Sequence, residues 1–179
     1  MHSRWVAWNG KARGQEATVG VDLQALAARR DDPGARARLV TGVHQVVRRY
    51  CRALVGRSEE GFGPADELAD ELARTILRDH YDEFGGPVPV EAIVYSRMAP
   101  VVSRVLEGRP RTPRPHLRGS ISPEHVHDKL GLLPPLARDV LVLRAFVGMT
   151  SDQAGRALGL TPNLVLQEQR RALGRLRSL

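Results

Sequence analysis

Residues 150–165, TSDQAGRALGLTPNLV, restrict the possible folds more than any other stretch of this chain. Thr150 followed by Gln153 is a capping box, which starts a helix. Thr161 can cap a second helix, with Pro162 at its first position. The pattern therefore predicts two short helices that follow each other closely.

The residues between these start signals support the same pair of helices. Gly155 is small where the helices would cross, Gly159 fits a turn that needs an unusual backbone angle, and Val165 returns to the core. This spacing fits a helix-turn-helix, in which the second helix enters the major groove of DNA. A generic helical hairpin is the alternative, because short motifs have a high false-positive rate.

Composition favours helices in the rest of the chain. With 179 residues, the protein is long enough for one domain or two modest ones. Aromatic residues make up 4% and β-branched runs are short, which argues against a large sheet. Alanine, leucine and arginine, which are good helix formers, are abundant. We therefore expect an all-α fold.

Three features bear on the compartment. No apolar stretch approaches the roughly 20 residues needed to span a bilayer. The N-terminus lacks the apolar centre of a secretory signal, so residues 1–21 are expected to be a leader, either disordered or packed through Trp5 and Trp8 on the first helix. Cys51, the single cysteine, excludes an internal disulfide and fits a reducing cytoplasm. It lies on an apolar helical face and is interpreted as a core residue.

The net charge of +7 is unevenly distributed. Residues 1–107 contain 15 Arg and Lys against 15 Asp and Glu, whereas residues 108–179 contain 12 against 5. The C-terminal part therefore carries the whole excess, which points to an anionic partner. The alternative is that arginine is simply frequent here, because only Lys11 and Lys129 are lysines.

Residues 22–106 are predicted to form a helical domain. Asp22 can cap a short helix, and Asp32 with Pro33 starts a longer one that Gly56 ends. The apolar positions of the longer helix have helical spacing: Leu39, Val43, Val46, Val47, Tyr50, Cys51 and Leu54.

Two more helices complete this domain. The third starts near Pro64, and the fourth follows the helix-breaking stretch FGGPVP at 84–89. Pro100 falls inside the fourth helix, where a proline removes one backbone hydrogen bond at a cost of roughly 3 kcal/mol. A kink or a break is therefore expected at Ala99. Their buried faces are predicted to comprise Leu68, Leu72 and Ile76 in the third helix, and Val90, Ile93, Val94, Val101, Val102 and Val105 in the fourth.

Residues 107–122, EGRPRTPRPHLRGSIS, are predicted to be a flexible basic linker between two domains. Three prolines, four arginines and no apolar run are typical of an extended, solvated segment. In the second domain, residues 123–179, a short helix would carry Val126 and Leu130, and Pro134 would open a longer helix that Gly148 ends. The apolar surface of the longer helix is expected to contain Leu136, Val140, Leu141, Leu143 and Val147.

The helix from Thr161 to about Arg177 carries polar residues on the side expected to be exposed. Asn and Gln can pair with adenine edges, and Arg with guanine or phosphate. Glu168 is repelled by phosphate but can accept a hydrogen bond from cytosine, and Leu166 can meet a thymine methyl. The alternative is that Leu166 packs on a partner protein and Glu168 is a solvated charge. The candidate DNA-contacting residues are Thr161, Asn163, Leu164, Gln167, Arg170 and Arg171.

Residues 132–177 resemble region 4 of bacterial sigma-70-family sigma factors of the extracytoplasmic-function (ECF) class. The family pattern is an LPxxxRxVLxLR helix, a GxSxxEIAxxLG helix and a recognition helix that ends in RALxxLR. The resemblance implies an initiation factor that contacts the −35 promoter element through the 161–177 helix. The matching residues are Leu133, Pro134, Arg138, Val140, Leu141, Leu143, Arg144, Gly148, Leu158, Gly159, Val165, Arg171, Ala172, Leu173, Leu176 and Arg177.

The N-terminal half is similar to region 2 of the same family, through RRYCRALVG at 48–56 and ADELADEL at 65–72. In the family, the second segment binds the clamp coiled coil of core RNA polymerase, and an anti-sigma factor is a frequent further partner. From the residues alone, this segment is a solvated helix whose carboxylates suit the helix dipole. The resemblance implies that four of its carboxylates face the polymerase: Asp66, Glu67, Asp70 and Glu71.

The chain also departs from the family pattern. In the segment that melts and reads the −10 element, it offers Tyr95, Arg97 and Arg104. The linker is basic, whereas the family's linker is often acidic. These departures support an alternative, a diverged sigma-like accessory or regulatory protein that acts through protein contacts without independent initiation. The departing residues are Asp70, Pro100, Val101, Leu166 and Glu168.

No catalytic, metal or cofactor site is expected. His125, His127 and Asp128 alternate along the chain, so a metal site there would need ligands from elsewhere. No glycine-rich phosphate loop, nucleophile elbow or pair of catalytic carboxylates can be identified. A small helical enzyme therefore has no support beyond these histidines, and catalysis would belong to the polymerase.

Overall fold

The structure, a computed structural model, describes residues 21–58, 61–108 and 129–178. Within these ranges the chain forms helices and one isolated bridge, between Ser58 and Gly61, which confirms the all-α prediction. The helices are α2 (Leu23–Ala27), α3 (Pro33–Val55), α4 (Gly63–His80), the 3₁₀-helix η1 (Tyr81–Glu83), α5 (Val90–Glu107), α7 (Pro135–Leu141), the π-helix η2 (Val142–Val147), α8 (Ser151–Leu158) and α9 (Pro162–Ser178).

Several sequence predictions lie outside the described residues. They are the leader at 1–20 with its two tryptophans, most of the linker, and the histidine pair of EHVHD. Of the short helix predicted after the linker, residues 129–131 are described as helical, and Leu130 within them is buried.

Side-chain caps confirm the predicted helix starts in the N-terminal half. The carboxylate of Asp22 accepts a hydrogen bond from the backbone N–H of Ala25 at 3.2 Å, and Asp32 accepts one from Ala35 at 2.9 Å. These bonds satisfy N–H groups that have no partner within the helix. At the other end of α3, Gly56 stops the helix with a φ of 77°, as predicted.

Of the kink or break expected at Ala99, the break is wrong, because helix α5 continues through Pro100. The proline still lacks the N–H that would bond to the preceding turn. However, Met98, Ala99 and Val102 are all buried around it. Their apolar packing offsets the lost backbone bond, which the sequence pattern could not reveal.

The predicted helix after Pro134 forms as α7 and then widens into the π-helical stretch η2. Gly148 ends it with a φ of 85°, as predicted. The expectation that Leu136 belongs to its apolar surface is wrong, because that side chain is 43% exposed. Ala137, the next residue, occupies the buried position in the first turn.

The helix-turn-helix forms as α8 and α9. The capping box is present in both directions, since Thr150 Oγ1 accepts from the N–H of Gln153 and Gln153 Oε1 accepts from the N–H of Thr150. Gly159 adopts a left-handed conformation with a φ of 68°. A Cβ atom on Gly155 would lie 2.6 Å from the carbonyl oxygen of Leu160, so only glycine permits this close approach.

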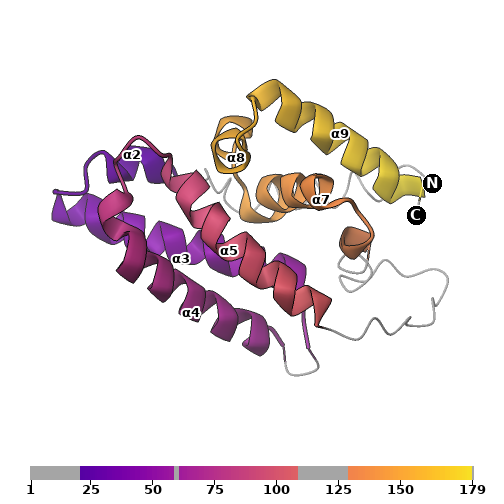
Figure 1. Cartoon of the computed structure of the whole chain (residues 1–179), viewed down its shortest axis with the longest axis horizontal. Coiled ribbons are helices and arrows are strands. Elements are labelled where there is room, and N and C mark those ends of the chain that lie inside the picture. Colours follow the sequence, from indigo (N-terminus) through magenta and orange to yellow (C-terminus); the bar gives the residue numbers. More distant parts are fainter. Residues whose placement is uncertain (1–20, 59–60, 109–128, 179) are drawn as a thin grey trace, which may run out of the picture.

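The C-terminal helices pack against the N-terminal ones. In Figure 1, α7, α8 and α9 lie on one side of α3 and α5, and α4 lies on the other side. The π-helix η2 contacts α3, and α8 contacts α5. None of the helices in the described ranges combines the length and hydropathy needed to cross a bilayer.

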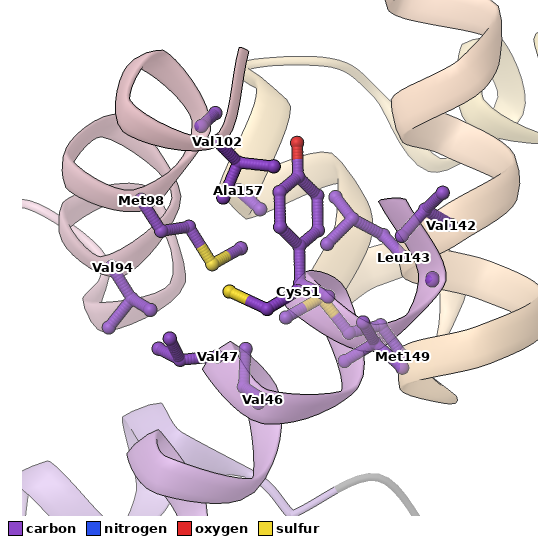
Figure 2. Packing of buried hydrophobic residues seen from close by; sticks show 14 of the residues in the cluster. Val46, Val47, Cys51, Val94, Met98, Val102, Val142, Leu143, Met149 and Ala157 are labelled. Atoms are coloured by element: carbon purple, nitrogen blue, oxygen red, sulfur yellow. The ribbon is translucent and has the colours of Figure 1, made fainter. Parts of the chain in front are cut away.

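Apolar side chains of both halves form one continuous core. Figure 2 shows Val46 and Cys51 of α3 with Met98 of α5 on one side and Leu143 of η2 on the other. Cys51 is fully buried, as expected of a core residue. Burial, together with the nearby Asp66 carboxylate, raises the pKa of its thiol to about 12.

We predict that Gly155→Ala destabilises the protein by about 1–3 kcal/mol, because the new methyl group collides with a backbone carbonyl that cannot rotate away. Gly174→Ala is the matched control. Gly174 lies in α9, and a Cβ atom there would meet no other described segment within 4 Å, so alanine should stabilise the helix by about 0.5–1 kcal/mol. Urea unfolding followed by circular dichroism measures both changes, and an unaffected Gly155→Ala midpoint would contradict the close approach.

Candidate functional site

The side of α9 that faces away from the molecule carries all six candidate DNA-contacting residues. Its inner side is fixed by Val165 and Ala172, which are buried. On the outer side, the side chains predicted to contact DNA are exposed without exception: Thr161, Asn163, Leu164, Gln167, Arg170 and Arg171. The sequence therefore placed this set correctly on the surface.

Neighbouring segments hold α9 in position. The Arg144 guanidinium, from η2, donates to Gln169 Oε1 at 3.2 Å and also to the carbonyl oxygen of Met149. At the start of α9, Thr161 Oγ1 accepts from the N–H of Leu164 at 3.4 Å. Thr161 therefore acts as the predicted cap. The hydrogen bonds of Arg144 and the buried residues of α9 determine which side of the helix is exposed.

The exposed side of α9 is mostly basic. Arg170, Arg171, Arg175 and Arg177 are exposed, whereas Glu168 is the single acidic residue of the helix. Glu168 is more than a solvated charge, because its carboxylate pairs with Arg171 at 2.6 Å. This pair neutralises one arginine and leaves three without an acidic partner in the described part of the chain.

The four carboxylates of α4 divide into two pairs. Asp66 accepts two hydrogen bonds of 2.6 Å from Arg52, and Asp70 accepts one of 2.7 Å from Arg48. The guanidinium of Arg52 therefore lowers the pKa of Asp66, despite partial desolvation. Glu67 and Glu71 are exposed and make no ion pair within the described residues.

The two aspartates and the two glutamates of α4 differ in whether their carboxylates can bind an outside partner. The aspartates fasten α4 to α3, because both of their cationic partners lie on that helix. The glutamates keep their full charge available to an outside partner. Of the four residues predicted to bind the polymerase, only Glu67 and Glu71 are free in this sense within the described ranges.

Helix α5 carries the three residues that the resemblance associates with the −10 element. Arg97 and Arg104 are exposed. Tyr95 is half-buried, and its hydroxyl donates a 2.7 Å hydrogen bond to the carboxylate of Asp139 on α7. One of the three is therefore engaged within the protein.

Asp139 is the centre of a buried cluster that sequence reasoning missed. It is 6% exposed and also accepts a 3.1 Å hydrogen bond from the hydroxyl of Tyr50 on α3. The Tyr50 and Tyr95 rings meet edge to face, with centroids 6.3 Å apart. Burial, and the adjacent carboxylate, raise the pKa of both tyrosines, so both remain protonated donors. The available signal was an aspartate within a predicted apolar stripe.

A second polar contact joins α5 to α8. Glu91 is 1% exposed, and its two carboxylate oxygens accept hydrogen bonds of 2.8 and 3.2 Å from Arg156. These bonds raise the pKa of the arginine, whose guanidinium also lies 3.5 Å from Asp22. Beside this pair, the Gln153 amide donates to the carbonyl oxygen of Val21 at 3.3 Å.

The described residues contain no group of three or more His, Cys, Asp or Glu side chains that could hold a metal ion. The histidine pair considered from the sequence lies outside the described ranges. The described surfaces present exposed cationic and amide groups on α9 and exposed carboxylates on α4.

Comparison with known proteins gives a consistent family. Residues 130–178 match the family model "Sigma-70, region 4". The chain is 30% identical to the ECF RNA polymerase sigma factor ShbA of Streptomyces griseus, over 93% of this chain and 98% of that protein. It is 29% identical to the ECF RNA polymerase sigma factor SigD of Mycobacterium tuberculosis, over 82% and 77% of the two chains.

Solved structures show the same fold. CnrH, in complex with the cytosolic domain of CnrY, aligns with a TM-score of 0.57 at 24% identity, over 87% of this chain and 93% of that one. The sigma factor RpoE of Bartonella quintana, in complex with the anti-sigma factor NepR, aligns with a TM-score of 0.50 at 18% identity, over 79% and 94%. Given the helix-turn-helix, the all-helical fold and a relative at 30% identity that is matched over 98% of its length, the chain belongs to the ECF class of sigma-70-family sigma factors.

Proposed function

We propose that this chain binds core RNA polymerase and directs promoter-specific transcription initiation, with α9 contacting the −35 element. The observation that carries the proposal is the basic, polar and fully exposed outer side of α9 on a fixed helix-turn-helix. The relatives named ECF RNA polymerase sigma factors support it. In this proposal the chain performs no catalysis itself, since the polymerase supplies it.

On α9, sequence reading and affinity fall to different residues. Asn163 and Gln167 are four positions apart and exposed, so they project from one side of the helix toward base edges. Arg170 and Arg171 lie further along and neutralise phosphates, which contributes affinity without sequence information. Thr161 and Leu164 lie at the helix start, where they complete the contact.

On α4, the proposed contact with the polymerase is made by Glu67 and Glu71, which are exposed and four positions apart. Asp66 and Asp70 support this contact by holding α4 on α3 through their arginine partners. Residues 22–106 and 123–179 would then act as the polymerase-binding and the −35-binding units, joined by the 107–122 linker. An anti-sigma factor is a further proposed partner, because both structural neighbours are complexes, one with CnrY and one with an anti-sigma factor.

A second candidate function is an accessory or regulatory protein that binds the polymerase without starting transcription. The engagement of the Tyr95 hydroxyl by Asp139 favours it, as does the exposed apolar side chain of Leu164 at the start of α9. Leu166, the leucine expected to pack on a partner, is half-buried. Under this alternative, α9 contacts protein through its leucines and not DNA.

One experiment separates the two functions. The full chain is mixed with core RNA polymerase purified from Streptomyces, and genomic DNA fragments are selected on the complex and transcribed in a run-off assay. Defined start sites that depend on the added chain support the initiation factor. Stable polymerase binding without any such start site supports the accessory protein, and no binding at all removes both.

We predict that Glu67→Lys combined with Glu71→Lys weakens binding to core polymerase by about tenfold or more, because two free carboxylates become cations. Asp31→Lys is the surface-charge control, since Asp31 is exposed just before α3 and has no partner among the described residues. Affinities are measured by fluorescence anisotropy with labelled protein. The control adds two charges and the double variant adds four, so a control loss of log affinity half as large as that of the double variant would mean that only net charge matters.

We predict two distinct effects of substitutions on α9. Gln167→Ala should relax base preference at one promoter position at a cost of about 1–3 kcal/mol. Arg170→Ala should weaken binding evenly across sequences and reduce the dependence of log affinity on log salt by about one. Arg29→Ala, at an exposed site on the N-terminal half, is the control and should change neither. The measurement is a salt titration of the reconstituted holoenzyme on the selected promoter and its single-base variants.

A further inference from the structure

The exposed arginines of α9 lie on two different flanks of its outer side. Successive residues of an α-helix are about 100° apart, so positions around α9 can be given relative to Gln167, near the centre of the outer side. Arg170 and Arg177, the first flank, lie about 60° and 80° to one side of Gln167. Arg171 and Arg175, the second flank, lie about 40° and 80° to the other side. Arginines therefore border the centre of the outer side on both sides.

Arg175 and Arg177, in the last turn of α9, lie outside the set of residues so far assigned to DNA. Both are exposed, and neither has an acidic partner within the described residues. Cations in the last turn of a helix also suit the helix dipole. The dipole does not, however, require one cation on each flank of the outer side. Their placement therefore indicates a contact that extends along both flanks.

Glu168 makes the two flanks unequal in charge. It lies about 100° from Gln167, on the side of the second flank, and its side chain is 21% exposed. Its Oε1 atom lies 2.6 Å from Nη1 of Arg171. An ion pair this exposed contributes little to stability, but it offsets the charge of the arginine. Within the described residues, the first flank therefore carries two unpaired cations and the second flank only one.

The dimensions of DNA place the two flanks against different strands. The major groove is about 12 Å wide, and an α-helix with its side chains is about 10–12 Å across. A helix that lies in the groove with its centre toward the bases therefore has a sugar–phosphate strand along each side. Arginines on opposite flanks of such a helix reach phosphates of opposite strands.

We propose that Arg175 and Arg177 are further phosphate contacts on opposite strands of the promoter duplex, and that Glu168 weakens the contact of the second flank. The first flank consequently binds its strand more strongly. The proposal rests on the proposed function, in which α9 lies on the −35 element. Arg171 keeps its place in that contact, with its charge offset. Glu168 is a positioning residue, because it acts through Arg171.

The first test measures the charge of the second flank in the full chain. Glu168→Gln keeps the length of the side chain, removes its charge and frees Arg171 to neutralise a phosphate. The slope of log affinity against log salt, on a fluorescein-labelled duplex of arbitrary sequence, should therefore steepen by about one. Asp31→Asn is the matched control, because it removes the same charge from an exposed site before α3 and should leave the slope unchanged. Equal slopes in Glu168→Gln and the parent would show that Glu168 offsets nothing.

The second test assigns each flank to a strand. Duplexes of the selected promoter carry uncharged methylphosphonate linkages across the −35 element, on one strand or on the other, and are bound by the reconstituted holoenzyme. The parent should lose several-fold more affinity when one particular strand is neutral. Arg177→Gln should reduce the sensitivity to that strand alone, and Arg175→Gln the sensitivity to the opposite strand alone. Glu168→Gln should bring the two sensitivities closer together.

Two results of the strand test would overturn the proposal. If Arg175→Gln and Arg177→Gln change the sensitivity to the same strand, the two flanks do not contact opposite strands. If neither variant changes either sensitivity, these arginines contact no phosphate. Circular dichroism confirms that each variant keeps its helices, which is expected because both side chains are exposed.

The two tests keep this proposal apart from the proposed function. Should the chain direct initiation while the salt slope and the strand sensitivities of the variants equal those of the parent, the initiation function stands and the flank proposal is withdrawn. Should the chain fail to direct initiation while Glu168→Gln steepens the slope, the initiation function is wrong, and the strand assignment falls with it. The charge offset by Glu168 then stands alone, because the first test needs no polymerase.

Discussion

A carboxylate removed from water needs other hydrogen-bond donors, because an unpaired buried charge is strongly destabilising. Besides a 3.5 Å contact from the neighbouring Arg138, Asp139 accepts hydrogen bonds from Tyr50 on α3 and Tyr95 on α5, two helices that precede it in sequence by many residues. Apolar packing between the halves would tolerate a small slip, whereas these two directed bonds do not. These two bonds therefore fix how the C-terminal helices lie on the rest of the molecule, together with the Glu91–Arg156 pair and the bond from Arg49 to the carbonyl oxygen of Val147.

Local structure could be read from the sequence to a large extent, because it is encoded by nearest neighbours. The capping carboxylates of Asp22 and Asp32 form the predicted hydrogen bonds, and so does the capping box before α8. Gly155 and Gly159 occupy the positions that the tight turn requires. The exposure of the polar side of α9 follows from the same periodicity. These features depend on contacts within about four residues, which a single sequence displays directly.

Features that depend on distant segments could not be read in this way. The burial of Asp139 and Glu91 requires partners on helices far away in the sequence, so neither residue stood out as functional. The pairing of Asp66 with Arg52 across α3 and α4 likewise changes what an acidic segment can do. Pro100 was overestimated as a breaker, because the buried side chains around it were unknown. Leu136 was predicted to be buried because it is apolar, but it is exposed. An apolar residue in the first turn of a helix does not by itself indicate which side of the helix other segments cover.

The segment RRYCR at 48–52 of α3 contacts both α4 and the C-terminal helices. Arg48 and Arg52 face the α4 aspartates, while Arg49 and Tyr50 reach Val147 and Asp139 in the C-terminal half. Each residue of a helix is rotated by about 100° from the one before it. The position of each of these five residues along α3 therefore decides whether its side chain points toward α4 or toward the C-terminal helices. Deleting a single residue just before it would turn every arginine toward the wrong helix. Length variation within the family should therefore be tolerated in the loops but strongly selected against in α3.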